Sequence, residues 1–334
     1  MKKSLLLIPA ALLCCLAAVS CGTPAPEKGL WEQAGFSSPD QTVATVDGRE
    51  VPAGVYLYWL SEITDEIRRS CQEQEQTLDW SSDTETGTLA QYAKEQALES
   101  AALYATVENW AGQYDCPLTE ADQTDVETVW QDTAAEHGGQ ETYLASLAQK
   151  GLDQAGARRM AEDHVLYQKL CRLAQEENSP LWEDASALSE FYQQRGYVTV
   201  DLVEFSADAA EEAASLFGRI NESADPVAEL GRIRQERGES GYPRTLLPGD
   251  GSLPDAYAQA AAALSPGQIS GVVEGPDGFA ILARLEDDCE AVRLDLLDRR
   301  LLDAAAGAEI TVSQSYQELD VQTFCNALDA ARGS

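Results

Sequence analysis

The fold is decided by a segment that begins Tyr197-Val198-Thr199-Val200-Asp201-Leu202-Val203-Glu204-Phe205, a run dense in β-branched and aromatic residues. Val198, Val200 and Leu202 fall on one face at period two, which predicts a strand. Outward from this strand the spacing changes to that of helices, then to a loop rich in glycine and proline. The predicted elements are helices over 209–220, 227–235 and 255–264, a short strand near 245–247, and strands over 269–273 and 279–285.

This order of elements resembles the parvulin family of peptidyl-prolyl isomerases. The local match lies in the runs Leu253-Pro254-Asp255-Ala256-Tyr257, Leu264-Ser265-Pro266-Gly267-Gln268-Ile269-Ser270 and Gly278-Phe279-Ala280-Ile281. The resemblance implies a parvulin-like domain over residues 196–287, a small antiparallel sheet with surrounding helices. It also implies an apolar pocket in which Leu253 and Tyr257 receive a proline ring.

The positions that carry the family's chemistry are altered. Leu202 and Ala280 stand where the family has histidines, and they complete the predicted substrate-binding set with Leu253 and Tyr257. Glu236 and Glu239 are the acids nearest the family's catalytic Cys or Asp, which makes them the candidates for a catalytic role.

Loss of the histidines bears directly on the mechanism. Rotation about a peptide bond has a barrier of about 18–20 kcal/mol, and a catalyst must stabilise the twisted amide through arranged hydrogen bonds. Leucine and alanine side chains donate none. The sequence therefore predicts weak or absent isomerase activity with a retained binding groove. A working isomerase that uses Glu236 or Glu239, Tyr257 and backbone groups stays open as an alternative.

The N-terminus has the pattern of an export signal. Residues 1–20 join Lys2-Lys3 to an apolar run that is too short to span a membrane. The following Ala18-Val19-Ser20-Cys21 resembles a bacterial lipobox, which implies lipid attachment at Cys21 and an extracytoplasmic protein anchored to the cell membrane. Residues 21–40, with several prolines and glycines, are predicted to be a flexible tether.

Charge and rare residues limit the partners. The formal net charge of −34 disfavours nucleic acid, whose binding requires phosphate neutralisation. An acidic surface keeps a protein soluble, and attraction of basic unfolded chains is a second interpretation. The cysteines after Cys21 form no Cys-x-x-Cys pair, so disulfides and free thiols both stay open. His137 and His164 lack ligand-like neighbours, and we expect no metal or cofactor.

The rest of the chain is predicted to form a mostly helical domain. Apolar stripes recur at three-to-four spacing over 54–72, 89–113, 120–137, 140–150, 153–177 and 182–194. Residues 42–46 predict a strand, followed by a turn at Asp47-Gly48 and the start of the first helix. This opening, together with Gly138-Gly139, Tyr143-Leu144 and Lys150-Gly151-Leu152, resembles the PrsA/SurA-type foldases.

The C-terminal residues 288–334 are predicted to contain a helix over 291–306 and a strand over 308–312. We expect this strand to pair with residues 42–46. The fold class is then α+β, with a SurA/PrsA-like chaperone domain built from residues 41–195 and 288–334 and the parvulin-like domain inserted in it.

The predicted function is that of a membrane-anchored foldase or chaperone for unfolded, newly exported polypeptides. A solute-binding lipoprotein of a transporter is an alternative that would need two α/β lobes, and residues 89–194 contain no strand signal. A structural envelope lipoprotein is a further alternative. The clients, the oligomeric state and the presence of an outer membrane are not determined by the sequence.

Overall fold

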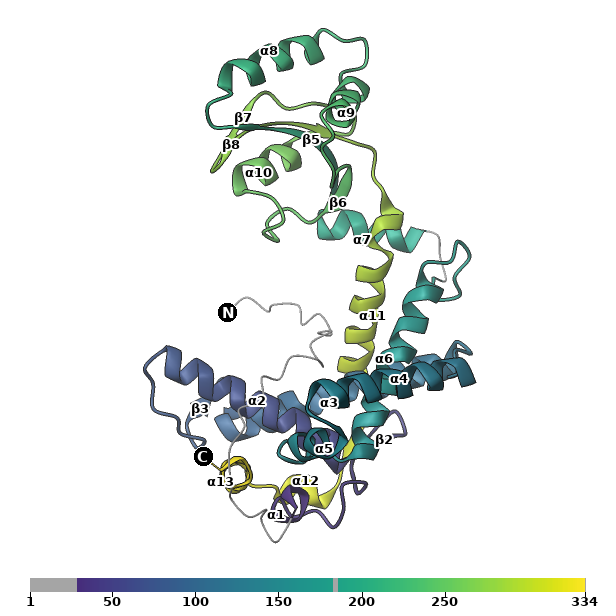
Figure 1. Ribbon diagram of the computed structural model, residues 1–334, viewed down its shortest axis with the longest axis vertical. Helices are drawn as coiled ribbons and strands as arrows, with labels where there is room; N and C mark the ends of the chain where they lie inside the picture. Colours follow the sequence, from purple (N-terminus) through teal and green to yellow (C-terminus); the bar gives the residue numbers. More distant parts are fainter. Residues whose placement is uncertain (1–28, 183–185, 334) are drawn as a thin grey trace. The chain divides into compact units, whose positions relative to one another are not determined.

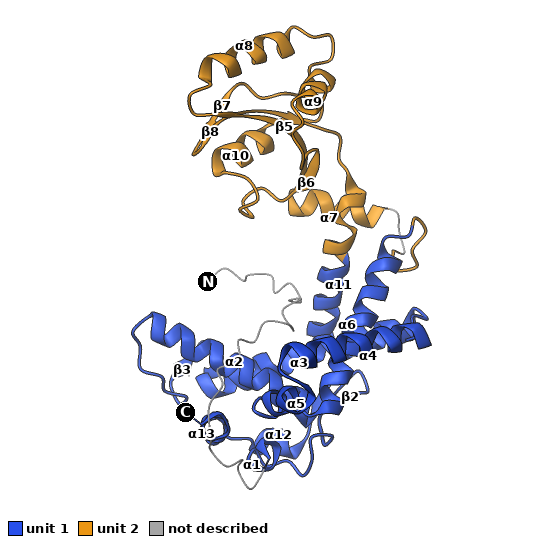
Figure 2. Ribbon diagram, in the orientation of Figure 1, with its two compact units in different colours: residues 1–176, 297–334 blue, residues 177–296 orange. Residues whose placement is uncertain are grey.

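The computed structural model describes residues 29–182 and 186–333, and the chain divides into two compact units (Figure 2). Unit 1 comprises residues 1–176 and 297–334, and unit 2 comprises residues 177–296. The predicted signal peptide and the predicted lipid-carrying Cys21 lie outside the described residues.

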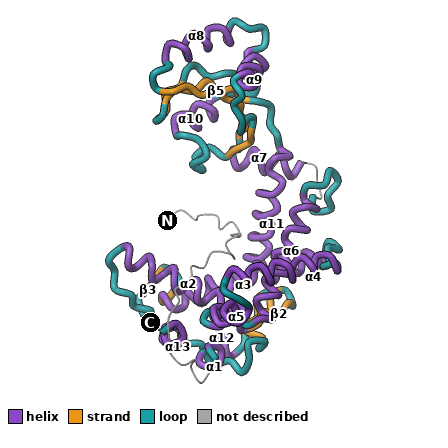
Figure 3. Tube along the Cα trace, viewed as in Figure 1, coloured by secondary structure: helices purple, strands orange, loops and turns teal. Residues whose placement is uncertain are grey.

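Unit 1 is mainly helical, as predicted (Figures 1 and 3). Its described helices are α1 (Leu30–Gln33), α2 (Ala53–Glu73), α3 (Leu89–Gln113), α4 (Glu120–Glu136), α5 (Gln140–Ala148), α6 (Gln154–Ala174), α12 (Gln314–Glu318), α13 (Val321–Arg332) and the larger part of α11 (Arg293–Gly307). A small hairpin of β3 (Asp83–Thr84) and β4 (Gly87–Thr88) precedes α3. Thr88 then caps α3 by accepting a hydrogen bond from the Gln91 amide.

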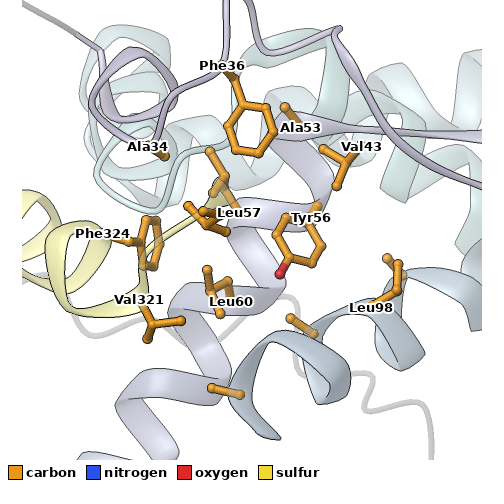
Figure 4. Close-up of a cluster of buried hydrophobic side chains, with 14 of the residues drawn as sticks. Ala34, Phe36, Val43, Ala53, Tyr56, Leu57, Leu60, Leu98, Val321 and Phe324 are labelled. Atoms are coloured by element: carbon orange, nitrogen blue, oxygen red, sulfur yellow. The ribbon is translucent and has the colours of Figure 1, made fainter. Parts of the chain in front are cut away.

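The core of unit 1 forms around α2. Leu57 and Leu60 of α2 face Phe324 and Val321 of α13 in Figure 4. On α3, four alanines at four-residue spacing are buried in the same core and let the backbones of α2 and α3 approach closely: Ala93, Ala97, Ala101 and Ala105. Burial of a leucine or phenylalanine side chain is worth about 1.5–3 kcal/mol, so α13 is a substantial part of this core.

The two ends of unit 1 meet in a three-stranded sheet. Its strands β1 (Thr42–Val46), β2 (Arg49–Pro52) and β9 (Ile310–Val312) are arranged in the order β2-β1-β9. Antiparallel pairing of β1 with β9 places Thr45 opposite Thr311, which confirms the predicted return of the C-terminal strand. Strand β2, between the Asp47-Gly48 turn and the helix predicted over 54–72, was not predicted. Both turn residues have positive φ, which closes a two-residue β1–β2 hairpin, and α2 begins only at Ala53.

The flexible tether predicted over residues 21–40 is wrong for its described C-terminal part. Leu30 and Phe36 are both 3% exposed and belong to the core around α2. The glycines and prolines of this stretch are therefore compatible with packing, because two apolar side chains anchor it.

Helices α12 and α13 were not predicted individually. Asp320 caps α13, and two ion pairs fasten the helix to α2: Arg68 to Asp329 at 2.6 Å and Arg332 to Asp65 at 2.9 Å.

Unit 2 contains a four-stranded antiparallel sheet in the order β6-β5-β8-β7. The strands are β5 (Val198–Ser206), β6 (Arg244–Leu246), β7 (Val273–Gly275) and β8 (Gly278–Arg284). Helix α10 (Asp255–Ala263) packs on one face of the sheet, and α8 (Ala210–Asn221) and α9 (Pro226–Glu236) pack on the other (Figure 1). The predicted α+β class with a small antiparallel sheet and surrounding helices is confirmed.

Two details of unit 2 differ from the prediction. The strand expected over 269–273 is reduced to a single bridge between Ile269 and Ala283, and β7 starts at Val273. The predicted domain boundary between residues 195 and 196 falls inside unit 2, because α7 (Ser186–Arg195) packs with the short 3₁₀ helix η2 (Cys289–Val292). Leu188 and Tyr192 of α7 and Val292 are buried together there.

Within the described segments, no helix is both long and apolar enough to cross a bilayer. The five cysteines in these segments, Cys71, Cys116, Cys171, Cys289 and Cys325, are all free thiols. Of the two interpretations left open by the cysteine spacing, the structure has the free thiols.

Candidate functional site

The four residues predicted to bind substrate lie together on one face of the unit 2 sheet. Leu202 comes from β5 and Ala280 from β8, while Leu253 and Tyr257 lie just before and inside α10. All four belong to a single cluster of buried apolar side chains. The period-two alternation of β5 brings this about, because it sends Leu202 to the α10 face and the neighbouring Val203 to the α8–α9 face.

This cluster is covered in the structure. None of its four residues is more than 5% exposed. The Tyr257 ring lies against the backbone of Gly275, where an added Cβ would be only 2.5 Å from the tyrosine Cζ. Tyr242, from the loop between α9 and β6, is half-buried and packs on the same cluster. A proline ring can therefore reach these residues only when part of the cover moves.

The Tyr257 hydroxyl is the one side-chain hydrogen-bonding group among the four. It makes no hydrogen bond to any residue that the structure describes, so it is free to donate to a ligand. Burial raises the pKa of Tyr257, and the negative charges of Glu204 and Asp277 raise it further. The phenol consequently keeps its proton at neutral pH.

The candidate catalytic acids are not brought to this cluster. Glu236 forms an ion pair with Arg232 on the exposed side of α9, and Glu239 forms one with Arg237. Neither side chain belongs to the apolar cluster that contains Leu202, Leu253, Tyr257 and Ala280, which we call the pocket cluster. Neither is among the charges that act on Tyr257. Each carboxylate is instead engaged by an arginine at the surface of unit 2.

Glu204 adjoins this cluster and was not predicted as a candidate. It lies on β5 two residues after Leu202 and is the cross-strand partner of Ala280. Its side chain is exposed and has no hydrogen bond or ion pair with a described residue. The signal was present in the sequence, because period two places residue 204 on the same strand face as residue 202.

The sheet behind the site is held by a buried arginine. The Arg284 guanidinium donates to the carbonyls of Thr199 at 3.2 Å and Leu285 at 3.0 Å, and to Asp287 Oδ1 at 2.5 Å. The Tyr192 hydroxyl of α7 lies 2.9 Å from Thr199 Oγ1. The charge-assisted bond from Arg284 to the Thr199 carbonyl ties β8 to β5, and the Tyr192 hydroxyl ties α7 to the same strand.

A four-stranded antiparallel sheet with α10 on its pocket face and α8 and α9 behind it is the architecture of a parvulin-type domain. Residues 186–287 match the family model described as the PPIC-type PPIASE domain. The chain therefore carries a domain of the PPIC-type peptidyl-prolyl isomerase family, and the resemblance inferred from its motifs is confirmed.

Several solved structures are similar to this chain at low identity. PrsA from Bacillus anthracis is 17% identical, with 70% of this chain and 97% of that chain covered and a TM-score of 0.25. The foldase protein PrsA from Lactococcus lactis is 14% identical, covering 86% and 99% with a TM-score of 0.31. A SurA-like chaperone from Campylobacter jejuni is 13% identical, covering 80% and 93% with a TM-score of 0.24. No match was found among curated proteins.

Proposed function

We propose that this chain is an extracytoplasmic foldase or chaperone that holds proline-containing segments of unfolded, exported polypeptides, with weak or absent isomerase activity. One observation carries the proposal. The four residues that the parvulin resemblance assigns to a proline pocket lie in one apolar cluster of the PPIC-type domain, and Leu202 and Ala280 bring no side-chain hydrogen-bond donor to it.

The energetics favour binding over catalysis at such a site. Apolar contact with a proline ring stabilises the ground state and the twisted amide about equally, and uniform binding does not lower a barrier. Loss of a single well-placed donor from a catalytic site costs about 10²–10³ in rate. With two donor positions replaced, the Tyr257 hydroxyl is the remaining candidate for stabilising the twisted amide.

The decisive test compares binding and catalysis on matched peptides. Peptide pairs that differ only by proline or alanine at one position report whether the site prefers proline. Prolyl isomerisation of the same proline peptides reports catalysis, and aggregation of an unfolded secreted protein reports chaperone activity. Tyr257→Phe is the suitable variant because it removes the hydroxyl and keeps the packing. Truncation of a fully buried aromatic to alanine would cost about 3–5 kcal/mol and disturb the fold.

We expect proline-dependent binding and suppressed aggregation without measurable catalysis. Catalysis that Tyr257→Phe abolishes would favour the alternative of an active isomerase with a non-standard site. Absence of both proline preference and aggregation suppression would refute the chaperone proposal.

Membrane attachment is a separate part of the proposal and rests on the lipobox-like run that ends at Cys21. A lipid on Cys21 would hold the chain in the membrane fraction of the producing bacterium. Growth with a radiolabelled fatty acid should label the wild-type protein, and Cys21→Ala should abolish the labelling. An unlabelled wild type, or a variant labelled like wild type, would refute lipid anchoring at this residue.

A further inference from the structure

Glu204 occupies a defined position beside the proline pocket. Across the pocket face of the sheet it is paired with Ala280 of β8, which is paired in turn with Val273 of β7. Ala280 carries only a methyl group, and Val273 packs on the pocket cluster. Glu204, Ala280 and Val273 therefore lie side by side on three neighbouring strands across the candidate site, and Glu204 is the only charged residue of the three.

The Glu204 carboxylate is uncompensated, unlike its neighbours. In the same unit, Arg232 engages Glu229 and Glu236, and Arg237 engages Glu212 and Glu239. Arg237 also donates to the main-chain carbonyl of Glu204 at 2.9 Å, but the Glu204 side chain has no ion pair with a described residue.

Two tyrosines complete the surroundings of this carboxylate. Burial raises the pKa of both Tyr257 and Tyr242, and the negative charge of Glu204 raises each pKa further. Arg244 lies over the Tyr242 ring at 5.5 Å and acts on that tyrosine, whereas the charges acting on Tyr257 are the acids Glu204 and Asp277. The field at the pocket tyrosine is therefore negative, and the Tyr242 ring already holds a guanidinium.

We propose that Glu204 directs this site toward segments in which a lysine or arginine lies next to the proline. A carboxylate beside aromatic rings is a favourable arrangement for an ammonium or guanidinium group, through a charge-assisted hydrogen bond and cation–π attraction. The inference rests on the proposed function, because it names the class of segment that the same pocket takes.

The position of Glu204 distinguishes this inference from ordinary surface acidity. In a chain with a net charge of −34 most exposed acids only solvate the surface. Glu204 differs because it lies on the face of Leu202 and Ala280. Glu274 of β7 offers a matched comparison: it is also exposed and unpaired, but its cross-strand partner Phe279 packs on the opposite face of the sheet.

The test measures fluorescence anisotropy of labelled peptides that contain one proline flanked by lysine, glutamine or glutamate. The wild-type full chain should bind the lysine peptide about two- to fivefold more tightly than the glutamine peptide, the range of a single exposed ion pair, and the glutamate peptide more weakly. Glu204→Gln should abolish this order, and Glu274→Gln should preserve it. Because the pair is exposed, the preference should also shrink as salt rises from 0.05 to 0.5 M, an interval over which the screening length falls severalfold, from about 14 to about 4 Å.

The outcomes separate the two proposals. Proline-dependent binding whose charge preference is the same in wild type and Glu204→Gln would overturn the role of Glu204 and leave the proposed function standing. An equal loss of preference in Glu204→Gln and Glu274→Gln would also overturn it, because the effect would then be that of net charge. Absence of proline-dependent binding in every variant would refute the proposed function, and this inference with it.

Discussion

A buried ion pair between β5 and α9 offers the sharpest test of how unit 2 is held together. Arg234 Nε lies 2.6 Å from Asp201 Oδ1, and the two residues are 8% and 4% exposed. Gly231 of α9 makes room for the carboxylate, since a Cβ there would be 3.2 Å from Asp201 Oδ2. The perturbation is Arg234→Met, which keeps an unbranched apolar stem of similar length and removes the cation.

Loss of one partner leaves the other charge buried and uncompensated. Such changes cost about 3–5 kcal/mol, which lowers the ratio of folded to unfolded protein by at least about a hundredfold. The Arg234 guanidinium also donates to the Glu239 carbonyl at 3.1 Å, so the loop after α9 loses a contact as well. The methionine should recover only a little of this cost through apolar burial.

The cost should depend on pH in a predictable direction. Burial raises the pKa of Asp201, and Arg234 opposes that rise. Without Arg234 the pKa rises further, so the folded variant binds a proton that the unfolded chain releases above about pH 4. A group whose folded pKa is raised in this way loses stability as pH increases. The deficit of Arg234→Met should therefore be larger at pH 8 than at pH 5.

The assay is urea unfolding monitored by amide hydrogen exchange. Exchange in peptides from β5 and β8 reports the unfolding of unit 2 alone. Arg232→Met is the matched control, because Arg232 lies on the same helix with half of its side chain exposed, and solvent-exposed ion pairs contribute little to stability. A deficit for Arg234→Met no larger than that of the control, or one equal at both pH values, would refute the reasoning.

Three further predictions concern single positions. Gly278→Ala should destabilise unit 2 by about 2 kcal/mol or more, since φ is +151° and a Cβ would lie 2.0 Å from the Phe205 carbonyl oxygen of β5. A Cβ at Gly271 would meet nothing within 4 Å, so Gly271→Ala should leave the melting temperature of unit 2 unchanged. Burial and the neighbouring Glu108 raise the pKa of Asp163, so the wild-type protein loses stability as pH rises above about 4. Asp163→Asn removes this loss, so the urea midpoint of unit 1 in the variant should rise relative to that of wild type between pH 5 and pH 8. Urea midpoints that change equally with pH in both proteins would contradict this. Tyr242→Ala should expose part of the pocket cluster and increase binding of an apolar fluorescent dye, whereas unchanged dye binding would mean that other residues provide the cover.

Local patterns in the sequence were sufficient for most elements. Helix α3 has the predicted bounds, because a threonine cap, an alanine stripe and a following proline mark its limits. Helix α13 could also have been predicted, since Val321, Phe324 and Leu328 recur at helical spacing between the cap Asp320 and the left-handed Gly333. The sequence therefore contains the pattern of α13, although this helix was not predicted.

Other features depend on contacts that a linear pattern does not contain. The start of β7 is set by its register against β8, where Val273 lies opposite Ala280. The sequence alone does not determine this start, because the β-branched Ile269 and Val272 upstream fit a strand equally well. The predicted pocket residues do converge, because motif and alternation both point to them. Their burial beneath Tyr242 results from packing. The charge of Glu204 stays uncompensated because Arg232 and Arg237 form ion pairs with Glu236 and Glu239 instead.

The pairing of β1 with β9 has a consequence for the order in which the two units can fold. Strand β1 lies near the start of the described chain and β9 near its end, and all of unit 2 is encoded between them. As the chain emerges with its N-terminus first, unit 2 becomes complete while β1 and α2 still lack β9 and α13. The last segment to be synthesised therefore closes the first unit to be started, and until then the core around α2 is exposed to solvent and to other chains.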